Sequence, residues 1–96
     1  MPNPSTDLDR TFTAPIGVDV KGEIWPCVEL TGATELLGTG RSVRVDATVD
    51  DVPVENVGLM PTGRGELMLS LNAKLRKRLG KDVGDTVAVH LTRRLS

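Results

Sequence analysis

Residues 66–91 carry two different apolar periodicities in close succession, and this succession restricts the possible folds more than any other feature of the chain. Over residues 67–71 every second residue is leucine, which is typical of a strand with one buried face. Leu75 and Leu79 then lie one helical turn apart. The run therefore predicts a strand, a short helix and, after a glycine turn, a second strand.

Both ends of this helix are marked in the sequence. Asn72 is a favourable N-cap residue, and Gly80 stands where helices commonly end in the left-handed conformation. The helix is therefore predicted over residues 73–79. Gly84 then turns the chain into a last strand, predicted over residues 86–92.

An earlier part of the chain repeats this order of elements. Residues 11–20 and 23–30 have the composition and alternation of strands. Residues 32–37 are predicted to form a short helix with Thr31 as its N-cap. Residues 41–49, RSVRVDATV, form the clearest strand, because valine or alanine fills every second position from residue 43 onward.

The alternation also predicts which way strand side chains point. In residues 11–20 it places four apolar side chains on one face, namely Phe12, Ala14, Ile16 and Val18. In residues 67–71 the same rule directs Met68 and Ser70 away from the buried face.

Proline and pattern slips predict local irregularities. Pro15 indicates an edge position or a bulge, and Pro26 predicts a strand interrupted by a bend because it removes a backbone donor. Asp50 and Asp51 are predicted to form a hairpin turn. The strand that returns from this turn, up to residue 60, loses its alternation between Val54 and Val57, which predicts a bulge.

The two parts of the chain also share sequence letters. Residues 37–45 read LGTGRSVRV and residues 79–89 read LGKDVGDTVAV, so both contain Leu-Gly, a spacer and Gly-x-[Ser/Thr]-Val-x-Val. We therefore predict a mostly β fold built from two ββαβ repeats, each with too little apolar area to be stable alone. Packed about a pseudo-two-fold axis, the repeats are expected to form one small closed β-barrel with two short helices, which also removes exposed strand edges. A monomer is expected to fold alone, and further oligomerisation is left open.

Length and composition set the remaining boundaries. Ninety-six residues fit one domain, with residues 1–10 predicted to be a flexible N-terminal arm and residues 11–96 to be the single barrel domain. The single cysteine excludes an internal disulfide or a cysteine-cluster metal site. No apolar run approaches the roughly 18 residues of a membrane span. Residues 1–10 have no apolar region of the kind that a secretory signal contains, so they are not expected to act as one. A cytoplasmic protein without a cofactor or a metal is expected.

Charge divides the chain unevenly. Residues 1–60 carry four basic and ten acidic residues, a net charge of −6, whereas residues 61–96 carry eight basic and three acidic residues, a net charge of +5. One interpretation is an anion- or nucleic-acid-binding face, for which the candidates are Arg64, Lys74, Arg76, Lys77 and Arg78, with Arg41 and Arg44 as additions. The other interpretation is that the two halves neutralise each other in the fold.

Other reactive or bulky residues favour structural roles. His90 is predicted on the outer surface, and no orienting partner for a catalytic or metal-binding role is apparent. Cys27 is predicted to be a small buried hydrophobic residue. Trp25 is predicted in the core, although the mouth of a ligand pocket is an alternative. Around Arg64, the glycines predict a hairpin loop, with an anion-binding backbone nest as the alternative.

Several segments together resemble a known family: Phe12, residues 41–45, residues 59–61 with the glycine loop that follows, and residues 71–87. They are similar to the domain-of-unknown-function family 1905 over roughly residues 11–92. The resemblance implies a double-split β-barrel. The chain departs from the family pattern at residues 50–51, where the family usually has a glycine, and at Ser70, where it often has a proline.

The run of residues 66–91 is also similar to the AbrB-like transcription regulators and antitoxins. Those chains carry one such unit and complete the barrel by dimerising, and the resemblance implies nucleic-acid binding. The leading interpretation is nevertheless a non-enzymatic small β-barrel that acts as a binding or interaction module. The alternatives are an AbrB-like nucleic-acid-binding regulator and a small-molecule-binding barrel with a pocket near Trp25.

Overall fold

The structure, a computed structural model, describes residues 7–95 of the chain. It contains six strands and two helices, and the order strand, strand, helix, strand occurs two times along the chain. The elements are β1 (Asp7–Val20), β2 (Glu23–Leu30), α1 (Ala33–Leu37), β3 (Val43–Val49), β4 (Val52–Pro61), β5 (Leu67–Ser70), α2 (Ala73–Leu79) and β6 (Thr86–Arg94). The chain is mostly β, as the sequence predicts.

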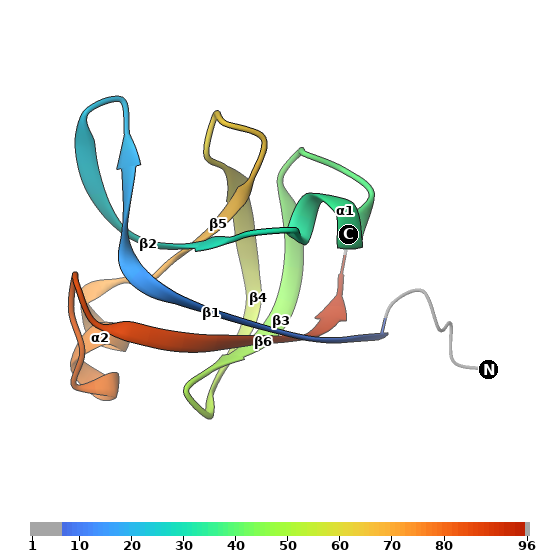
Figure 1. The fold of residues 1–96 in the computed structure, drawn as a ribbon. Helices are drawn as coiled ribbons and strands as arrows, with labels where there is room; N and C mark the ends of the chain where they lie inside the picture. The colour runs from blue at the N-terminus through green and yellow to red at the C-terminus, as the bar shows by residue number, and fades with distance from the viewer. Residues whose placement is uncertain (1–6, 96) are drawn as a thin grey trace.

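The six strands form a closed barrel in the order β1-β2-β5-β4-β3-β6, and each neighbouring pair is antiparallel. Figure 1 shows α2 at one side of this barrel and α1 near the opposite side, between β2 and β3. Within residues 7–95 no helix is long and apolar enough to cross a membrane.

Alternating side chains fill the barrel as predicted. In β3, residues 43, 45, 47 and 49 are all buried, whereas the residues between them are exposed or half-buried. The inward residues of β6 and the leucines at 67, 69 and 71 join the same core. Leu75 and Leu79 of α2 are partly buried and pack against it. The periodicity of the sequence therefore identifies most of the core correctly.

The predicted common face of β1 is wrong at Val18. The pairing of β1 with β2 shifts register between Ile16 and Val18, and Gly17 in between has φ 133°. This bulge sends Val18 to a second apolar cluster with Cys27 and Met68, while Ile16 stays in the barrel core. An extra residue in one strand inverts the direction of every later side chain, which alternation alone does not reveal.

Met68 is buried, with 2% of its surface exposed, although alternation directs it outward. It lies with Val18 and Cys27, and the partly buried Val20 and Met60 complete the cluster. These residues come from both hairpins, β1–β2 and β4–β5, whose tips extend on the same side of the molecule in Figure 1. The two hairpins thus cover an apolar surface outside the barrel that an isolated strand would expose.

The turns follow the sequence closely. Asp50 and Asp51 form the predicted β3–β4 turn, with φ of 47° and 72°. Two consecutive left-handed residues are what a tight two-residue hairpin requires, and Asp tolerates them better than most residues. The predicted bulge in β4 is also present, since the pairing slips between Val54 and Val57 and Asn56 has φ 52°.

Helix α2 has the predicted limits, but α1 is capped differently from the prediction. Its N-cap is Gly32, with φ 92° and no side-chain cap, so Thr31 does not serve as the cap. Instead, the Glu66 carboxylate accepts a hydrogen bond of 2.9 Å from the Gly32 N–H. The acceptor is 34 residues away in the chain, so a local signal does not identify it.

Two other strand predictions need correction. β1 begins at Asp7, so residues 7–10 of the predicted flexible arm belong to the sheet, where Asp7 pairs with Arg93 and Leu8 packs against the core. Residues 1–6 of that arm lie outside the described residues. β2 is one continuous strand through Pro26, whose carbonyl accepts a hydrogen bond from the Leu71 N–H.

Candidate functional site

Helix α2 is held firmly at both ends. The Asn72 side chain accepts a hydrogen bond of 2.8 Å from the Leu75 N–H at its start. At its end Gly80, with φ 68°, lets the N–H groups of residues 80 and 81 return to the carbonyls of Lys77 and Arg76. Because both ends are capped, the backbone of this short helix holds its residues at fixed positions on the surface.

Three of the predicted site residues lie exposed on this helix, namely Lys74, Lys77 and Arg78. None of them makes an ion pair with a residue in the described range 7–95. We call these three residues the cationic ridge. Among the five main candidates of the sequence, they are the residues whose charge no carboxylate of the described chain offsets.

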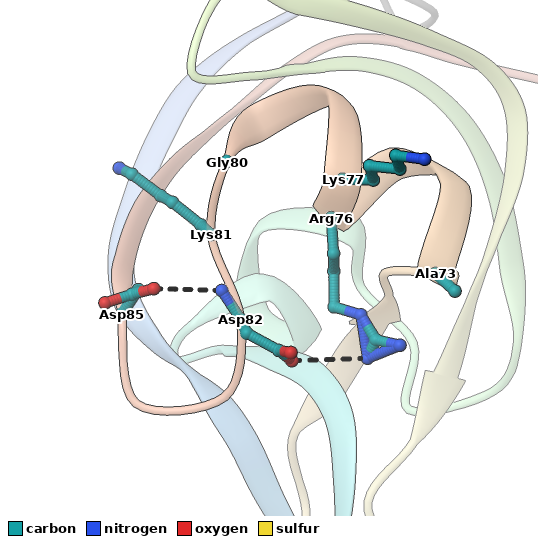
Figure 2. A pocket seen from close by; sticks show the side chains of 7 residues that line it. All are labelled: Ala73, Arg76, Lys77, Gly80, Lys81, Asp82 and Asp85. Atoms are coloured by element: carbon teal, nitrogen blue, oxygen red, sulfur yellow. Dashed lines mark hydrogen bonds and ion pairs between the residues drawn. The ribbon is translucent and has the colours of Figure 1, made fainter.

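Arg76 differs from the other predicted cations on the helix. Only 21% of its side chain is exposed, and its Nη1 lies 3.6 Å from Asp82 Oδ1. Its Nε is buried without a partner among the described residues. Figure 2 shows the side chain reaching from α2 toward Asp82 in the loop before β6. Arg76 therefore links the helix to that loop instead of extending the ridge.

A surface pocket of about 450 Å³ opens beside Arg76. Its lining combines three cations and two carboxylates with small residues, as Figure 2 shows: Ala73, Arg76, Lys77, Gly80, Lys81, Asp82 and Asp85. Both carboxylates are used locally, because Asp85 Oδ2 accepts from the Asp82 N–H at 2.9 Å and Asp82 Oδ1 accepts from the Val83 N–H at 2.8 Å. The pocket thus has a nearly balanced charge.

A smaller hollow of about 180 Å³ lies on α2 and the start of β4. It is lined by Val52, Pro53, Val54, Asn72, Lys74, Leu75 and Arg78. Four of these residues are apolar, and two belong to the cationic ridge. We call this site the α2–β4 hollow, and sequence reasoning did not identify it because the strand and the helix meet only in the folded chain.

Lys81, another basic residue of the second half, pairs with a carboxylate of the first half. Lys81 Nζ contacts Asp50 Oδ2 at 2.5 Å and the Thr86 carbonyl at 2.7 Å. The Asp50 carboxylate also accepts from the Ala88 N–H at 2.8 Å. This backbone hydrogen bond first, and the Lys81 ammonium second, hold the pKa of Asp50 below its ordinary value.

Arg64 is also engaged with the first half. Its Nη1 donates to the Asp19 carbonyl at 2.8 Å, and its Nη2 lies 3.5 Å from Glu29 Oε1. The predicted hairpin loop around Arg64 is present, and the guanidinium joins it to the β1–β2 hairpin. The structure therefore separates the five predicted site residues into the exposed ridge and two engaged arginines.

The remaining candidates behave in different ways. Cys27 is buried as predicted, and burial raises the pKa of its thiol against the opposing effect of a hydrogen bond with Ser70. His90 has a partner that the sequence did not indicate, because its Nε2 lies 2.7 Å from Asp9 Oδ1 across the β1–β6 pair. Within residues 7–95 no three His, Cys, Asp or Glu side chains form a group that could hold a metal.

The prediction that Trp25 lies in the core is wrong. Its side chain is 38% exposed on the β1–β2 hairpin, next to Ile24, which is 59% exposed. Trp25 lines neither the Arg76 pocket nor the α2–β4 hollow. Trp25 pairs with Val18, which lies beyond the bulge at Gly17 and belongs to the second apolar cluster, so Trp25 lies on the part of the hairpin outside the barrel core.

Comparison with known proteins agrees with the resemblance noted in the sequence. A search among curated proteins found no match. A family model described as "Domain of unknown function (DUF1905)" matches residues 12–91, which include all six strands in whole or in large part and both helices. The chain therefore belongs to the domain-of-unknown-function family DUF1905.

Proposed function

We propose that the protein is a non-enzymatic binding module that takes an anionic ligand on the exposed face of α2. The observation that carries this proposal is the cationic ridge, in which three exposed cations lack an ion-pair partner among residues 7–95. By contrast, Arg64 and Lys81 are offset by carboxylates of the first half. Unpaired cations on one rigid helix form a local field that attracts anions.

The other helix shows that a barrel of this kind does not need a basic helix. α1 occupies the same place in the element order as α2, yet its sequence, ATELL, has one acidic residue and no basic one. We infer that the two halves are copies of one ββαβ unit. The pairings support this inference, since Phe12–Val89 and Ala14–Val87 correspond in place to Val57–Val45 and Leu59–Val43. The charge of α2 is then a specific property of one copy.

A role without catalysis is supported by the positions of the nucleophile and the base. Cys27 lies in the cluster outside the barrel, and its raised pKa keeps the thiol protonated. His90 lies on β6 and pairs with the exposed Asp9. β1 separates the strands of Cys27 and His90 in the barrel, and neither residue lines the Arg76 pocket or the α2–β4 hollow.

Nucleic acid is the second candidate ligand, in the manner of an AbrB-like regulator. The cationic ridge follows one side of the helix, because Lys77 and Arg78 lie three and four residues after Lys74. Groups that contact phosphates can be arranged in this way. The pI of about 5.7 and the net charge of −1 weigh against a long polyanion.

The test is binding of a labelled short glutamate peptide and of short duplex DNA at about 50 mM salt, followed by fluorescence anisotropy. The double variant Lys77→Glu/Arg78→Glu is expected to weaken binding about tenfold or more, because each exposed contact of about 0.2–1 kcal/mol becomes a repulsion. The matched control, Lys21→Glu/Arg93→Glu, makes the same change of net charge at exposed cations that lie outside α2 and outside the predicted site. Equal losses in both variants, or no binding by the wild type, would overturn the proposal.

A further inference from the structure

The α2–β4 hollow combines an apolar wall with a charged rim. Val52, Pro53 and Val54 supply one side from β4, and Leu75 supplies the other from α2. All four side chains are half-buried or exposed, so apolar surface is accessible inside the hollow. Lys74 and Arg78 lie at the same site and belong to the cationic ridge.

The hollow offers few groups that bind a polar ligand. Its amide, from Asn72, already accepts the hydrogen bond of the Leu75 N–H. The volume of about 180 Å³ corresponds to roughly six water molecules, at about 30 Å³ each. That space suits one aliphatic side chain. An occupant therefore gains most if it places an apolar group against Val54 and Leu75 and negative charges beside Lys74 and Arg78.

A protein segment satisfies these requirements better than nucleic acid does. No aromatic side chain lines the hollow, so a base has no ring on which to stack. A phosphate gains nothing from valine, proline and leucine. The overall charge of −1 also disfavours approach to a long polyanion, whereas it affects a short segment less.

We propose that the α2–β4 hollow is a docking site for an acidic protein segment that inserts one aliphatic side chain. The aliphatic residue packs against Val54 and Leu75, and flanking Asp or Glu residues pair with Lys74 and Arg78. This inference rests on the proposed anion-binding function and names its partner class. Charge then guides the encounter, and the apolar contact determines which acidic segments are retained.

The experiment uses two labelled unstructured peptides of equal length and charge. Both consist of Glu, Gly and Ser, and one carries Leu at its centre where the other carries Ser. Fluorescence anisotropy with the full chain is expected to show about tenfold tighter binding of the Leu peptide, because burying one aliphatic group in a pocket contributes that much selectivity. In the variant Val52→Thr/Val54→Thr, the preference for the Leu peptide is expected to disappear. In the variant Lys74→Glu/Arg78→Glu, both peptides are expected to bind at least tenfold more weakly.

The outcomes separate the docking proposal from the anion-binding function. Equal binding of the Leu and Ser peptides, with both weakened by Lys74→Glu/Arg78→Glu, refutes the apolar docking and leaves the anion site standing. Tighter binding of a duplex DNA of equal charge refutes the protein segment in favour of nucleic acid. Absence of binding by every probe refutes both proposals. Threonine preserves the β-branched shape that strands favour, and circular dichroism of each variant shows that the barrel is intact.

Discussion

The Asp50 side chain is the most informative single position for stability, because it joins the β3–β4 turn to β6 and to the end of α2. Its Oδ1 accepts from the Ala88 N–H at 2.8 Å, and its Oδ2 contacts Lys81 Nζ. Asp50→Asn keeps an acceptor for the amide and tolerates the φ of 47°, but removes the charge. We expect Asp50→Asn to lower the free energy of unfolding by about 1 kcal/mol. The variant loses an ion pair worth about 0.2–1 kcal/mol, and its neutral acceptor makes a weaker hydrogen bond with the Ala88 N–H.

Asp50→Ala is expected to cost more, about 3 kcal/mol. It removes a hydrogen bond to a charged acceptor, worth about 1.5–3 kcal/mol, and leaves alanine in a left-handed conformation that costs about 1–2 kcal/mol. Urea unfolding at pH 7, followed by circular dichroism, measures both values. Asp51→Asn is the matched control, because Asp51 occupies the same turn with φ 72° and makes no ion pair among residues 7–95.

The effect of Asp50 on stability is expected to depend on pH. The Ala88 N–H and then Lys81 lower the pKa of Asp50 in the folded state. A carboxyl of this kind stabilises the fold above its unfolded pKa of about 3.9, and the stabilisation is lost as pH falls through the folded pKa. The difference between the wild type and Asp50→Asn should therefore shrink between pH 7 and pH ~2. The reasoning is refuted if that difference is unchanged in acid, or if Asp51→Asn costs as much as Asp50→Asn at pH 7.

Three further predictions concern the helix cap and the second apolar cluster. Asn72→Ala removes the cap of α2 and is expected to cost about 1 kcal/mol in urea unfolding, whereas Asn72→Asp, which keeps the acceptor, should cost much less; equal losses would argue against capping. Met68→Ala is expected to lower the free energy of unfolding by about 2–5 kcal/mol. Trp25→Ala is expected to lower it less, because Trp25 is exposed. The reverse order would place Trp25 in the core. Cys27, buried with a raised pKa, is expected to react with iodoacetamide at pH 7.5 at least tenfold more slowly in the native chain than in urea, and equal rates would show that the cluster opens readily.

The sequence predicts those parts of the fold that depend on neighbouring residues. Alternation identifies the inward residues of β3, and Asn72 with Gly80 identifies the limits of α2. The slip between Val54 and Val57 correctly predicts a bulge. Each of these signals lies within a few residues of its effect, and each has one dominant physical cause.

The parts that depend on contacts between distant segments could not be predicted in this way. The burial of Met68 requires two hairpins to meet, and the partners of Gly32 and His90 are 34 and 81 residues away. For the candidate site, the exposure of Lys74, Lys77 and Arg78 follows from helix periodicity. The loss of Arg76 from that face follows from a loop that the helical pattern does not contain.

The closed order of strands has a consequence for how the chain can be reconnected. β1 and β6 are antiparallel neighbours, with Asp7 paired to Arg93, in the same way that β3 and β4 are neighbours joined by the turn at Asp50. A linker from β6 to β1, with a new start at Asp51 and a new end at Asp50, leaves every strand pairing in place and retains the Asp50 carboxylate beside Ala88 and Lys81. Such a circular permutant begins with the half that carries α2, and it is expected to build the same barrel in a different order of synthesis.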